Sequence, residues 1–500
     1  MIKRRAGYIF VLAFLFFTFS VATPAFAVIP QLIGPLSALA GIIGPILGFI
    51  GIALVTAFVF ARDTFKMIIY AIGRFVARYK VAILTIVIVA VLGGGFWIYQ
   101  ATRPIGINAG GVTQAADGKR VSSAWSTFRG TVARTGHLDT LPGPTSGKPI
   151  WTFKAKGSAV DFSSSPAVIR DRLYIGSTRG SIFSSEGVVY CIDANTGREL
   201  WQYPGEIPIF SAPSVVAGRV YVGEGFHQDS NCYLRCLDAN SGELIWRFPT
   251  TSHTESGPTI SQGKVYFSAG ADGVYCVDAL EGQEIWHYPS VHVDISPLVW
   301  QGTAYFGSGY GIYRIFAVDA NTGKEIWAKQ VDYPVWGSPT VHEDMVFFGL
   351  GNGNFLESNR NPKGRVIAVN AETGEQVWMY ELEDAVLTAI AYQNGFIYFS
   401  SRDGHVYALN ADDGQLHWKS SIGTPVVSSP AVTEEMVYVG ANNGGIYGID
   451  ISNGKVKWWF NTNEVAGNLK IYSSPAIANG KLYIGSTDRY IFCLGDEPDK

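Results

Sequence analysis

The distribution of apolar and polar positions divides the chain into two parts. In the first hundred residues, apolar side chains form long runs over 8–21, 28–61 and 81–99. From residue 146 onward, apolar and polar residues alternate over short stretches that glycine-containing turns separate. Long apolar runs are typical of membrane helices, whereas period-two alternation between turns is typical of half-buried strands. The pattern therefore predicts an N-terminal α-helical membrane region followed by an all-β domain.

The N-terminal region has the features of a secretory signal followed by membrane segments. Lys3-Arg4-Arg5 precedes the first apolar run, and Ala25-Phe26-Ala27 follows it, so we interpret residues 1–27 as a signal peptide or an uncleaved signal anchor. Residues 28–61 form a second hydrophobic membrane segment, and its three prolines are compatible with a full span or with a bent, re-entrant one. Residues 81–99 predict a transmembrane helix that ends in interfacial aromatic residues.

A basic amphipathic segment, 62–80, separates these two membrane segments. It is either an interfacial helix on anionic lipid or, as we favour, a basic cytoplasmic loop that sets the topology. The positive-inside rule then anchors the chain in the inner, cytoplasmic membrane through residues 28–99. Residues 100–145 read as a linker and cap, and everything beyond 99 is predicted to lie on the extracytoplasmic, periplasmic side.

A repeat of about forty residues fills the rest of the chain. In seven copies an Asp or Asn precedes a Gly by four residues, and the Gly precedes a Trp by four: these tryptophans are Trp201, Trp246, Trp286, Trp327, Trp378, Trp418 and Trp458. Upstream of each motif lie a Ser-Pro-like dipeptide, replaced in one unit by Thr388-Ala389, and an alternating strand. Each unit thus predicts four short strands, which is the signature of a propeller blade. We predict that the tryptophans dock neighbouring blades and do not bind a cofactor.

The two ends of the repeat region predict how the ring closes. An eighth unit begins at Ser474-Pro475 but stops before its Trp, and the missing half occurs at Gly147 to Trp151, again with Gly four residues before Trp. We therefore expect residues 146–153 to supply the outer strand of the last blade. The domain over 146–500 is predicted to be an eight-bladed β-propeller of four-stranded blades, without a free sheet edge at the seam.

The motif resembles the pyrroloquinoline quinone (PQQ)-like β-propeller repeat, most closely at Ala317–Trp327, and the resemblance covers about 146–495. Two branches share this repeat. One contains the propeller lipoprotein of outer-membrane β-barrel assembly, which implies a non-catalytic scaffold without a cofactor. The other contains the quinoprotein alcohol dehydrogenases, which implies PQQ with Ca²⁺. Against the second branch, the chain has no two adjacent cysteines and no Cys-x-x-Cys-His haem site; against the first, no cysteine for lipidation lies in residues 1–100.

Charge and cysteine content narrow the possible partners. Residues 101–500 carry 30 basic and 40 acidic side chains, which argues against binding of nucleic acid. Cys191, Cys236, Cys276 and Cys493 occupy one repeat position, so we predict small buried core residues there. A Cys232–Cys236 disulfide is disfavoured, since both residues are expected on one strand with the same orientation.

Residues three and five positions before each Pro should line the mouth of the central channel, because the Pro strand is innermost. The candidate cofactor- or ligand-binding residues are Asp161, His253, Glu255, His292, Asp294, Trp336, Asp384 and Lys470. His253 with Glu255 and His292 with Asp294 fall at matching heights on adjacent blades, which makes a metal or small-ligand site one hypothesis. The alternative that we favour is a water-filled axis lined by polar groups.

The longest insertions fall between the second and third strands of three blades, at 177–187, 224–233 and 350–364. We expect them on the same face as the channel mouth, which makes this face the binding surface for partners. The leading hypothesis is a membrane-anchored, extracytoplasmic propeller that binds envelope proteins as a non-catalytic scaffold. The alternatives are a PQQ- or metal-dependent quinoprotein oxidoreductase and a sensor domain for a small ligand.

Overall fold

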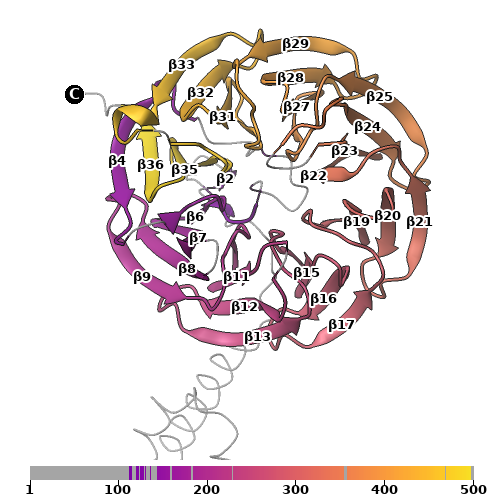
Figure 1. Cartoon of the computed structure of the whole chain (residues 1–500), viewed down its shortest axis with the longest axis horizontal. Helices are drawn as coiled ribbons and strands as arrows, with labels where there is room; N and C mark the ends of the chain where they lie inside the picture. The colour runs from indigo at the N-terminus through magenta and orange to yellow at the C-terminus, as the bar shows by residue number, and fades with distance from the viewer. Residues whose placement is uncertain are drawn as a thin grey trace, which may run out of the picture. The chain divides into compact units, whose positions relative to one another are not determined.

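Each repeat folds into a four-stranded antiparallel sheet, and eight such sheets surround a central axis (Figure 1). In blade 2 the strands run from the axis outward as β10 (Ser214–Val216), β11 (Arg219–Gly223), β12 (Cys232–Asp238) and β13 (Leu244–Thr250). The predicted eight-bladed propeller with four-stranded blades is confirmed.

The other blades have the same order. Blade 1 contains β6 (Ala167–Ile169), β7 (Arg172–Ser181), β8 (Ser184–Asp193) and β9 (Glu199–Pro204). Blade 3 contains β14 (Thr259–Ser261), β15 (Lys264–Ser268), β16 (Val274–Asp278) and β17 (Glu284–Tyr288). Blade 4 contains β18 (Leu298–Trp300), β19 (Thr303–Gly307), β20 (Arg314–Asp319) and β21 (Glu325–Gln330). Blade 5 contains β22 (Val335–His342), β23 (Met345–Gly351), β24 (Gly364–Asn370) and β25 (Gln376–Leu382).

Blade 6 contains β26 (Ala391–Gln393), β27 (Phe396–Ser400), β28 (His405–Asn410) and β29 (Leu416–Ser421). Blade 7 contains β30 (Ala431–Val432), β31 (Met436–Gly440), β32 (Gly445–Asp450) and β33 (Val456–Asn461), followed by the 3-10 helix η2 (Thr462–Glu464). Blade 8 contains β34 (Ala476–Ala478), β35 (Lys481–Gly485), β36 (Tyr490–Gly495) and β4 (Lys148–Lys154). Outside the blades, β1 (Val112–Gln114) pairs with β2 (Arg120–Ser122).

This computed structural model describes residues 112–114, 120–122, 124–128, 130, 136, 143–157, 160–181, 184–227, 229–353, 357–467 and 469–496. The predicted segments 1–27, 28–61, 62–80 and 81–99, and most of 100–145, lie outside these residues. Within the described ranges, no helix combines the length and apolar character that crossing a membrane requires.

Ring closure occurs where the sequence motif places it. Strand β4 completes blade 8 by pairing antiparallel with β36, with Trp151 opposite Cys493. The backbone N–H groups of Thr145 and Ser146 donate to the Asp496 carboxylate at 2.9 and 2.7 Å, which ties the residues before β4 to the residue after β36. The N-terminal strand of the propeller therefore supplies the edge that the last repeat lacks.

The repeated motif is a docking device between blades. In blade 2, Asp238 Oδ1 accepts two backbone N–H bonds of the following turn at 2.8 Å, and Gly242 adopts a φ of +76°. Trp201 of blade 1 lies over this turn: its Nε1 donates to Ala239 O at 3.2 Å, and a Cβ added to Gly242 would lie 2.6 Å from the ring. Equivalent tryptophan-to-carbonyl bonds join Trp151 to Ala194, Trp286 to Ala320, Trp327 to Ala371, Trp378 to Ala411 and Trp418 to Ile451, while Trp246 and Trp458 pack over Gly282 and Gly147.

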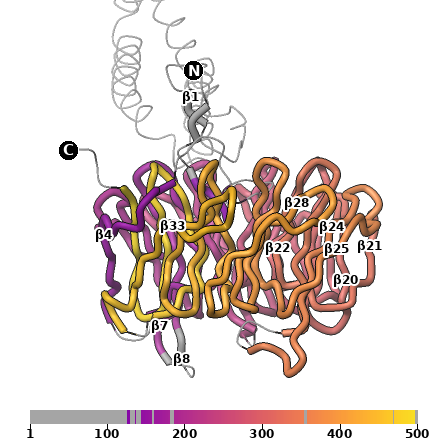
Figure 2. The backbone as a smooth tube through the Cα atoms, turned by 90° about the horizontal axis from the view of Figure 1, so that it is seen from above, coloured from indigo at the N-terminus to yellow at the C-terminus, as the bar shows by residue number. Residues whose placement is uncertain are grey.

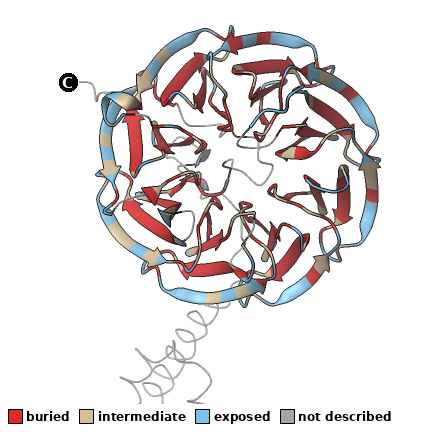
Figure 3. Ribbon diagram, in the orientation of Figure 1, coloured by how far each residue is buried: buried red, intermediate tan, exposed pale blue. Residues whose placement is uncertain are grey.

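Burial follows the same layering. The inner three strands of the blades are almost wholly buried, whereas the outer strands alternate between exposed and buried residues (Figure 3). All five cysteines are buried and free, and Cys232 and Cys236 lie on one strand, β12. Apolar packing between blades therefore fills the ring, and polar side chains concentrate at the axis and on the loops.

The cap segment enters the ring, which the repeat does not predict. Strand β3 (Ala124–Trp125) adds an innermost strand to blade 1 by pairing with β6. With β5 (Val160–Asp161), which pairs with β7, the sheet of blade 1 has six strands. Val215 N in blade 2 donates to Ser126 O at 2.6 Å, and Val432 N in blade 7 donates to Gly136 O at 2.8 Å. The described residues of this segment therefore contact blades 1, 2 and 7.

Candidate functional site

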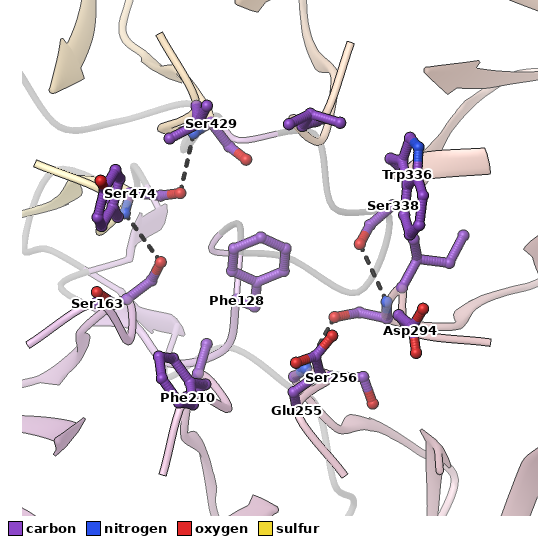
Figure 4. Close-up of a pocket in the computed structure, with 18 of the residues that line it drawn as sticks. Phe128, Ser163, Phe210, Glu255, Ser256, Asp294, Trp336, Ser338, Ser429 and Ser474 are labelled. Atoms are coloured by element: carbon purple, nitrogen blue, oxygen red, sulfur yellow. Dashed lines mark hydrogen bonds between the residues drawn. The ribbon is translucent and has the colours of Figure 1, made fainter. Parts of the chain in front are cut away.

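A cavity of about 410 Å³ lies on the axis of the propeller (Figure 4). Its walls come from the residues just before the innermost strands of the blades, as the repeat register predicts. Phe128, from the cap segment, lies near the middle of the ring of lining side chains, and a Cβ added to Gly257 would lie 3.1 Å from Phe128 Cβ. Because this segment contacts Val215 and Val432, beyond the prolines on the side away from the mouth, Phe128 forms the floor of the cavity.

Serines before the prolines form a hydrogen-bonded belt around the cavity. Ser474 N donates to Ser165 Oγ at 2.9 Å, and Ser429 N donates to Ser474 Oγ at 3.0 Å (Figure 4). The same link joins Gly257 to Ser296, Ser296 to Ser338 and Ala389 to Ser429. These serines thus link neighbouring blades around the axis, so many of the polar groups in the cavity wall are used in hydrogen bonds between blades.

Nearer the mouth, two histidines from adjacent blades converge on one carboxylate. His253 Nε2 and His292 Nε2 each lie 2.9 Å from Asp294 Oδ1. The side chains of His253 and Asp294 are 1% and 6% exposed, and Asp294 Oδ2 has no hydrogen-bond partner in the described structure. Burial alone would raise the pKa of Asp294, but the hydrogen bonds and charge of the two imidazoles hold it well below its usual value.

A third histidine, His227, joins this cluster from the insertion between β11 and β12. Ligand atoms of His227, His253, His292 and Asp294 all lie within 4.8 Å of one another. His227 is not among the residues that the repeat register predicts, because it lies in an insertion outside the register. Its presence in an insertion expected at the mouth is the one signal that could have found it.

The insertion that carries His227 has a buried ionic anchor at its base. Arg235 on β12 binds the Glu224 carboxylate through Nε at 2.8 Å and through a terminal nitrogen at 2.9 Å. Glu224 is also tied by its backbone to Thr254, the residue after His253, through bonds of 2.7 and 2.8 Å. This anchor fixes the base of the insertion beside the segment that carries His253.

Glu255 and aromatic rings complete the mouth. Glu255 Oε1 lies 4.0 Å from His227 Nε2, and burial together with the nearby Asp294 charge raises the pKa of Glu255 well above its usual value. Figure 4 shows Glu255 and Asp294 on the same side of the cavity. The Tyr310 ring lies 4.9 Å from the His292 ring and 5.1 Å from that of Trp336, so it covers the cluster from the rim.

Of the other residues that the sequence predicts for the site, some line the cavity and some do not. Asp161 and Trp336 line the cavity, as do Glu255 and Asp294. Asp384 is buried outside the set of lining residues, where it accepts a hydrogen bond from Ser358 and lies 3.9 Å from Arg402. Lys470 is exposed and also lies outside this set; its backbone N–H donates to Thr487. The structure therefore brings together the residues from blades 3 and 4 but not those from blades 6 and 8.

The residues of this cavity do not fit PQQ. The cofactor carries three carboxylates and therefore needs cationic or hydrogen-bond-donating partners. None of the described residues that line the cavity is Lys or Arg, and three of them are carboxylic acids, Asp161, Glu255 and Asp294. Phe128 moreover occupies the floor on the axis. A wall that holds carboxyl groups but no Lys or Arg among its described residues, together with a filled centre, opposes binding of a tricarboxylate here.

Comparison with curated proteins finds quinoprotein alcohol dehydrogenases that are similar to part of this chain. Quinohemoprotein alcohol dehydrogenase ADH IIB of Pseudomonas putida is 32% identical over 124 residues, which cover 21% of this chain and 17% of that one. The dehydrogenase subunit of the quinone alcohol dehydrogenase of Gluconacetobacter polyoxogenes is 31% identical over 151 residues, or 23% and 20% of the two chains. The match thus spans about a fifth of the length of these curated relatives.

Solved structures share the fold. BamB from Moraxella catarrhalis superposes with a TM-score of 0.54 at 20% identity, covering 70% of this chain and 99% of that chain. Quinohemoprotein alcohol dehydrogenase from Comamonas testosteroni gives a TM-score of 0.61 at 13% identity, covering 76% and 82%. Residues 135–231, 226–312, 294–360 and 362–494 match the model of one family across nearly the whole propeller. The chain therefore belongs to the family described as outer membrane protein assembly factor BamB.

Proposed function

We propose that this chain is a membrane-anchored, extracytoplasmic propeller that binds protein partners in the cell envelope and acts as a non-catalytic scaffold. The observation that carries the proposal is that the long insertions gather at one end of the ring. The β7–β8 hairpin and the loop between β23 and β24 project from the same end (Figure 2). His227, in the third insertion, reaches the cavity mouth at that end.

A rigid ring supports such a role, because it presents loops at fixed positions. The blades are locked by the tryptophan contacts and the serine belt, and the seam is closed by β4. Loops on a rigid scaffold are the usual carriers of binding function. Family membership and the poor match between the cavity and PQQ favour the scaffold over the quinoprotein alternative.

Site-specific photo-crosslinking in intact cells tests the proposal. A photoreactive amino acid at Glu186 or Asn359 would report on the loop end, and both positions are exposed. The matched controls are Asn195 and Glu372, which are exposed on turns at the opposite end of the same blades. We expect discrete protein adducts from the loop positions and none from the turns. Equal labelling at both ends, or none at either, would contradict the proposal.

Two further measurements separate the scaffold from the alternatives. Spheroplasts should expose the propeller to added protease while the chain stays in the inner-membrane fraction, as the predicted N-terminal anchor requires. Purified chain supplied with PQQ and Ca²⁺ should show no alcohol-dependent dye reduction. Dye reduction in that assay would contradict the scaffold function and support the oxidoreductase function.

A further inference from the structure

We propose that His227, His253, His292 and Asp294 form a binding site for one Zn²⁺ ion at the mouth of the cavity. The proposal rests on the side chains alone and is independent of the partner-binding role. The scaffold proposal assigns only protein partners to this face of the ring. The present proposal assigns it a first-row divalent metal ion as well.

The four ligand atoms are close to the spacing that Zn²⁺ requires. Zn²⁺ bonds histidine nitrogen and carboxylate oxygen at about 2.0–2.2 Å, so tetrahedral ligand atoms lie about 3.4 Å apart. The four groups here already lie within 4.8 Å of one another, with two of the pairs at 2.9 Å. Movements of about 1 Å, which rotation of the partly exposed His227 and His292 side chains supplies, would close the coordination sphere.

The hydrogen bonding of the cluster is incomplete without a cation. The Nε2 atoms of His253 and His292 both contact one oxygen of Asp294 at 2.9 Å, while the other oxygen, Oδ2, is buried without a partner among the described residues. The Nε2 of His227 is 4.0 Å from Glu255, beyond hydrogen-bonding distance. A cation at the centre would accept a lone pair from each of the three imidazoles and from one oxygen of Asp294, so the His227 nitrogen would gain a partner and the buried carboxylate a counter-charge.

The donor set selects the kind of cation. Three imidazoles and one carboxylate suit Zn²⁺ and its first-row neighbours, whereas Ca²⁺ requires six to eight oxygen ligands and Mg²⁺ an octahedron of oxygens. Ser252 Oγ lies 3.3 Å from His253 Nδ1, on the side of the ring away from Asp294. Such an outer contact orients a metal-binding imidazole and fixes which nitrogen faces the ion.

The ligands come from three consecutive blades. His227 belongs to the insertion of blade 2, His253 leads into blade 3, and His292 and Asp294 lead into blade 4. A bound ion would therefore connect the insertion to two blades and hold it against the mouth. We expect binding to raise the thermal unfolding temperature, because the ion binds the folded chain and not the separated ligands of the unfolded one.

The test uses full-length chain in detergent, stripped of metal with EDTA and titrated with Zn²⁺ against a chromophoric chelator. We expect one Zn²⁺ per chain with a dissociation constant below 1 μM, as an order of magnitude for a four-ligand site. Co²⁺ in place of Zn²⁺ should give the intense visible absorption of a four-coordinate ion. Ca²⁺ in a thousand-fold excess over Zn²⁺ should not compete.

Variants connect the binding to these residues. His227→Gln changes a partly exposed side chain on an insertion, and Asp294→Asn keeps the size of the buried group, so both should fold. Each should weaken Zn²⁺ binding at least ten-fold and abolish the cobalt absorption. The control is His417→Gln, since His417 is exposed on β29, outside the cluster, and should bind like the parent chain. Absence of stoichiometric binding, or equal binding by His227→Gln and His417→Gln, would overturn the proposal.

Discussion

The ring of Trp458 packs directly over Gly147, so the outer strand of blade 7 docks on the residue that leads into β4. A Cβ built on Gly147 would lie 2.4 Å from Trp458 Cε3. The packing resembles that of Trp201 over Gly242, although Gly147 and Trp458 lie near opposite ends of the propeller sequence. The junction before β4 therefore uses the same packing of Trp over Gly as the other blade junctions, although the Trp458 N–H lacks, among the described residues, the carbonyl partner that six of the tryptophans have.

Gly147→Ala is expected to destabilise the propeller through this contact. The added methyl group cannot fit without displacing the indole, and overpacking of this kind costs about 1–3 kcal/mol. The measurement is the free energy of unfolding in denaturant. Gly467→Ala is the control, because no atom lies within 4 Å of a Cβ built there. If both variants unfold alike, the seam does not depend on the close approach of Trp458.

A second prediction concerns the acid sensitivity of the docking turns. Asp450 accepts hydrogen bonds from the backbone and hydroxyl groups of Ser452 and pairs with Lys457 at 3.0 Å. These contacts outweigh burial and lower the pKa of Asp450 to about 2. Because the folded chain favours the ionised carboxylate, Asp450 stabilises the fold at pH values above about 4, and this stabilisation is lost as the pH falls toward 2.

Asp450→Asn should therefore destabilise the chain at pH 6, by up to about 1 kcal/mol for a partly exposed pair, and by clearly less at pH 2.5, where part of this stabilisation is already lost. The turn itself should survive, since Asn370 and Asn410 hold the equivalent position in blades 5 and 6. Denaturant titrations at the two pH values provide the measurement. A destabilisation that is equal at both would show that geometry, not charge, determines the contribution of Asp450.

The repeat explains why the fold could be predicted from the sequence and why some residues of the candidate site could not. Gly and Trp at fixed spacing determine a turn and a docking contact that are local to each pair of blades, so the sequence shows them directly. The same register placed Glu255 and Asp294 on the cavity wall. His227 and Phe128 lie outside the register, in an insertion and in the cap, and their positions depend on tertiary contacts that no spacing encodes.

Asp384 is a residue that the repeat register selects but that does not line the cavity. Counting back from Ala389 gives it the register of a channel residue, yet the insertion between β23 and β24 places Ser358 against its carboxylate, and Arg402 lies 3.9 Å away. A buried carboxylate requires hydrogen-bond donors. For Asp384 the donor is Ser358, in an insertion whose conformation the repeat does not predict. Register alone therefore predicts backbone position, while insertions decide which side chains face the cavity.

The serine belt gives a third prediction. Ser338 Oγ accepts the backbone N–H of Ser296 at 3.0 Å, and Ser338 is buried. Ser338→Ala leaves that N–H without its acceptor, at a cost of about 1–3 kcal/mol. Ser338→Thr keeps a hydroxyl and is the conservative comparison. Unfolding free energies and amide exchange at Ser296 provide the measurements, and unchanged exchange at Ser296 in the alanine variant would contradict the role of the belt.

The buried pair of Glu224 and Arg235 gives the last prediction, because it anchors the insertion that carries His227. The two side chains are 1% and 2% exposed and share two hydrogen bonds of 2.8 and 2.9 Å. Glu224→Gln leaves the buried Arg235 with only the exposed Glu206 carboxylate, at 3.5 Å, as an ionic partner among the described residues. Loss of the buried partner should cost up to about 3–5 kcal/mol and should also increase proteolysis within the insertion. Replacing both residues together by Met removes the charge as well as its partner, so most of the stability should return. Denaturant unfolding of the single and double variants measures the coupling. A double variant no more stable than Glu224→Gln would mean that the pair acts through its shape and hydrogen bonds to the insertion, not through balance of buried charge.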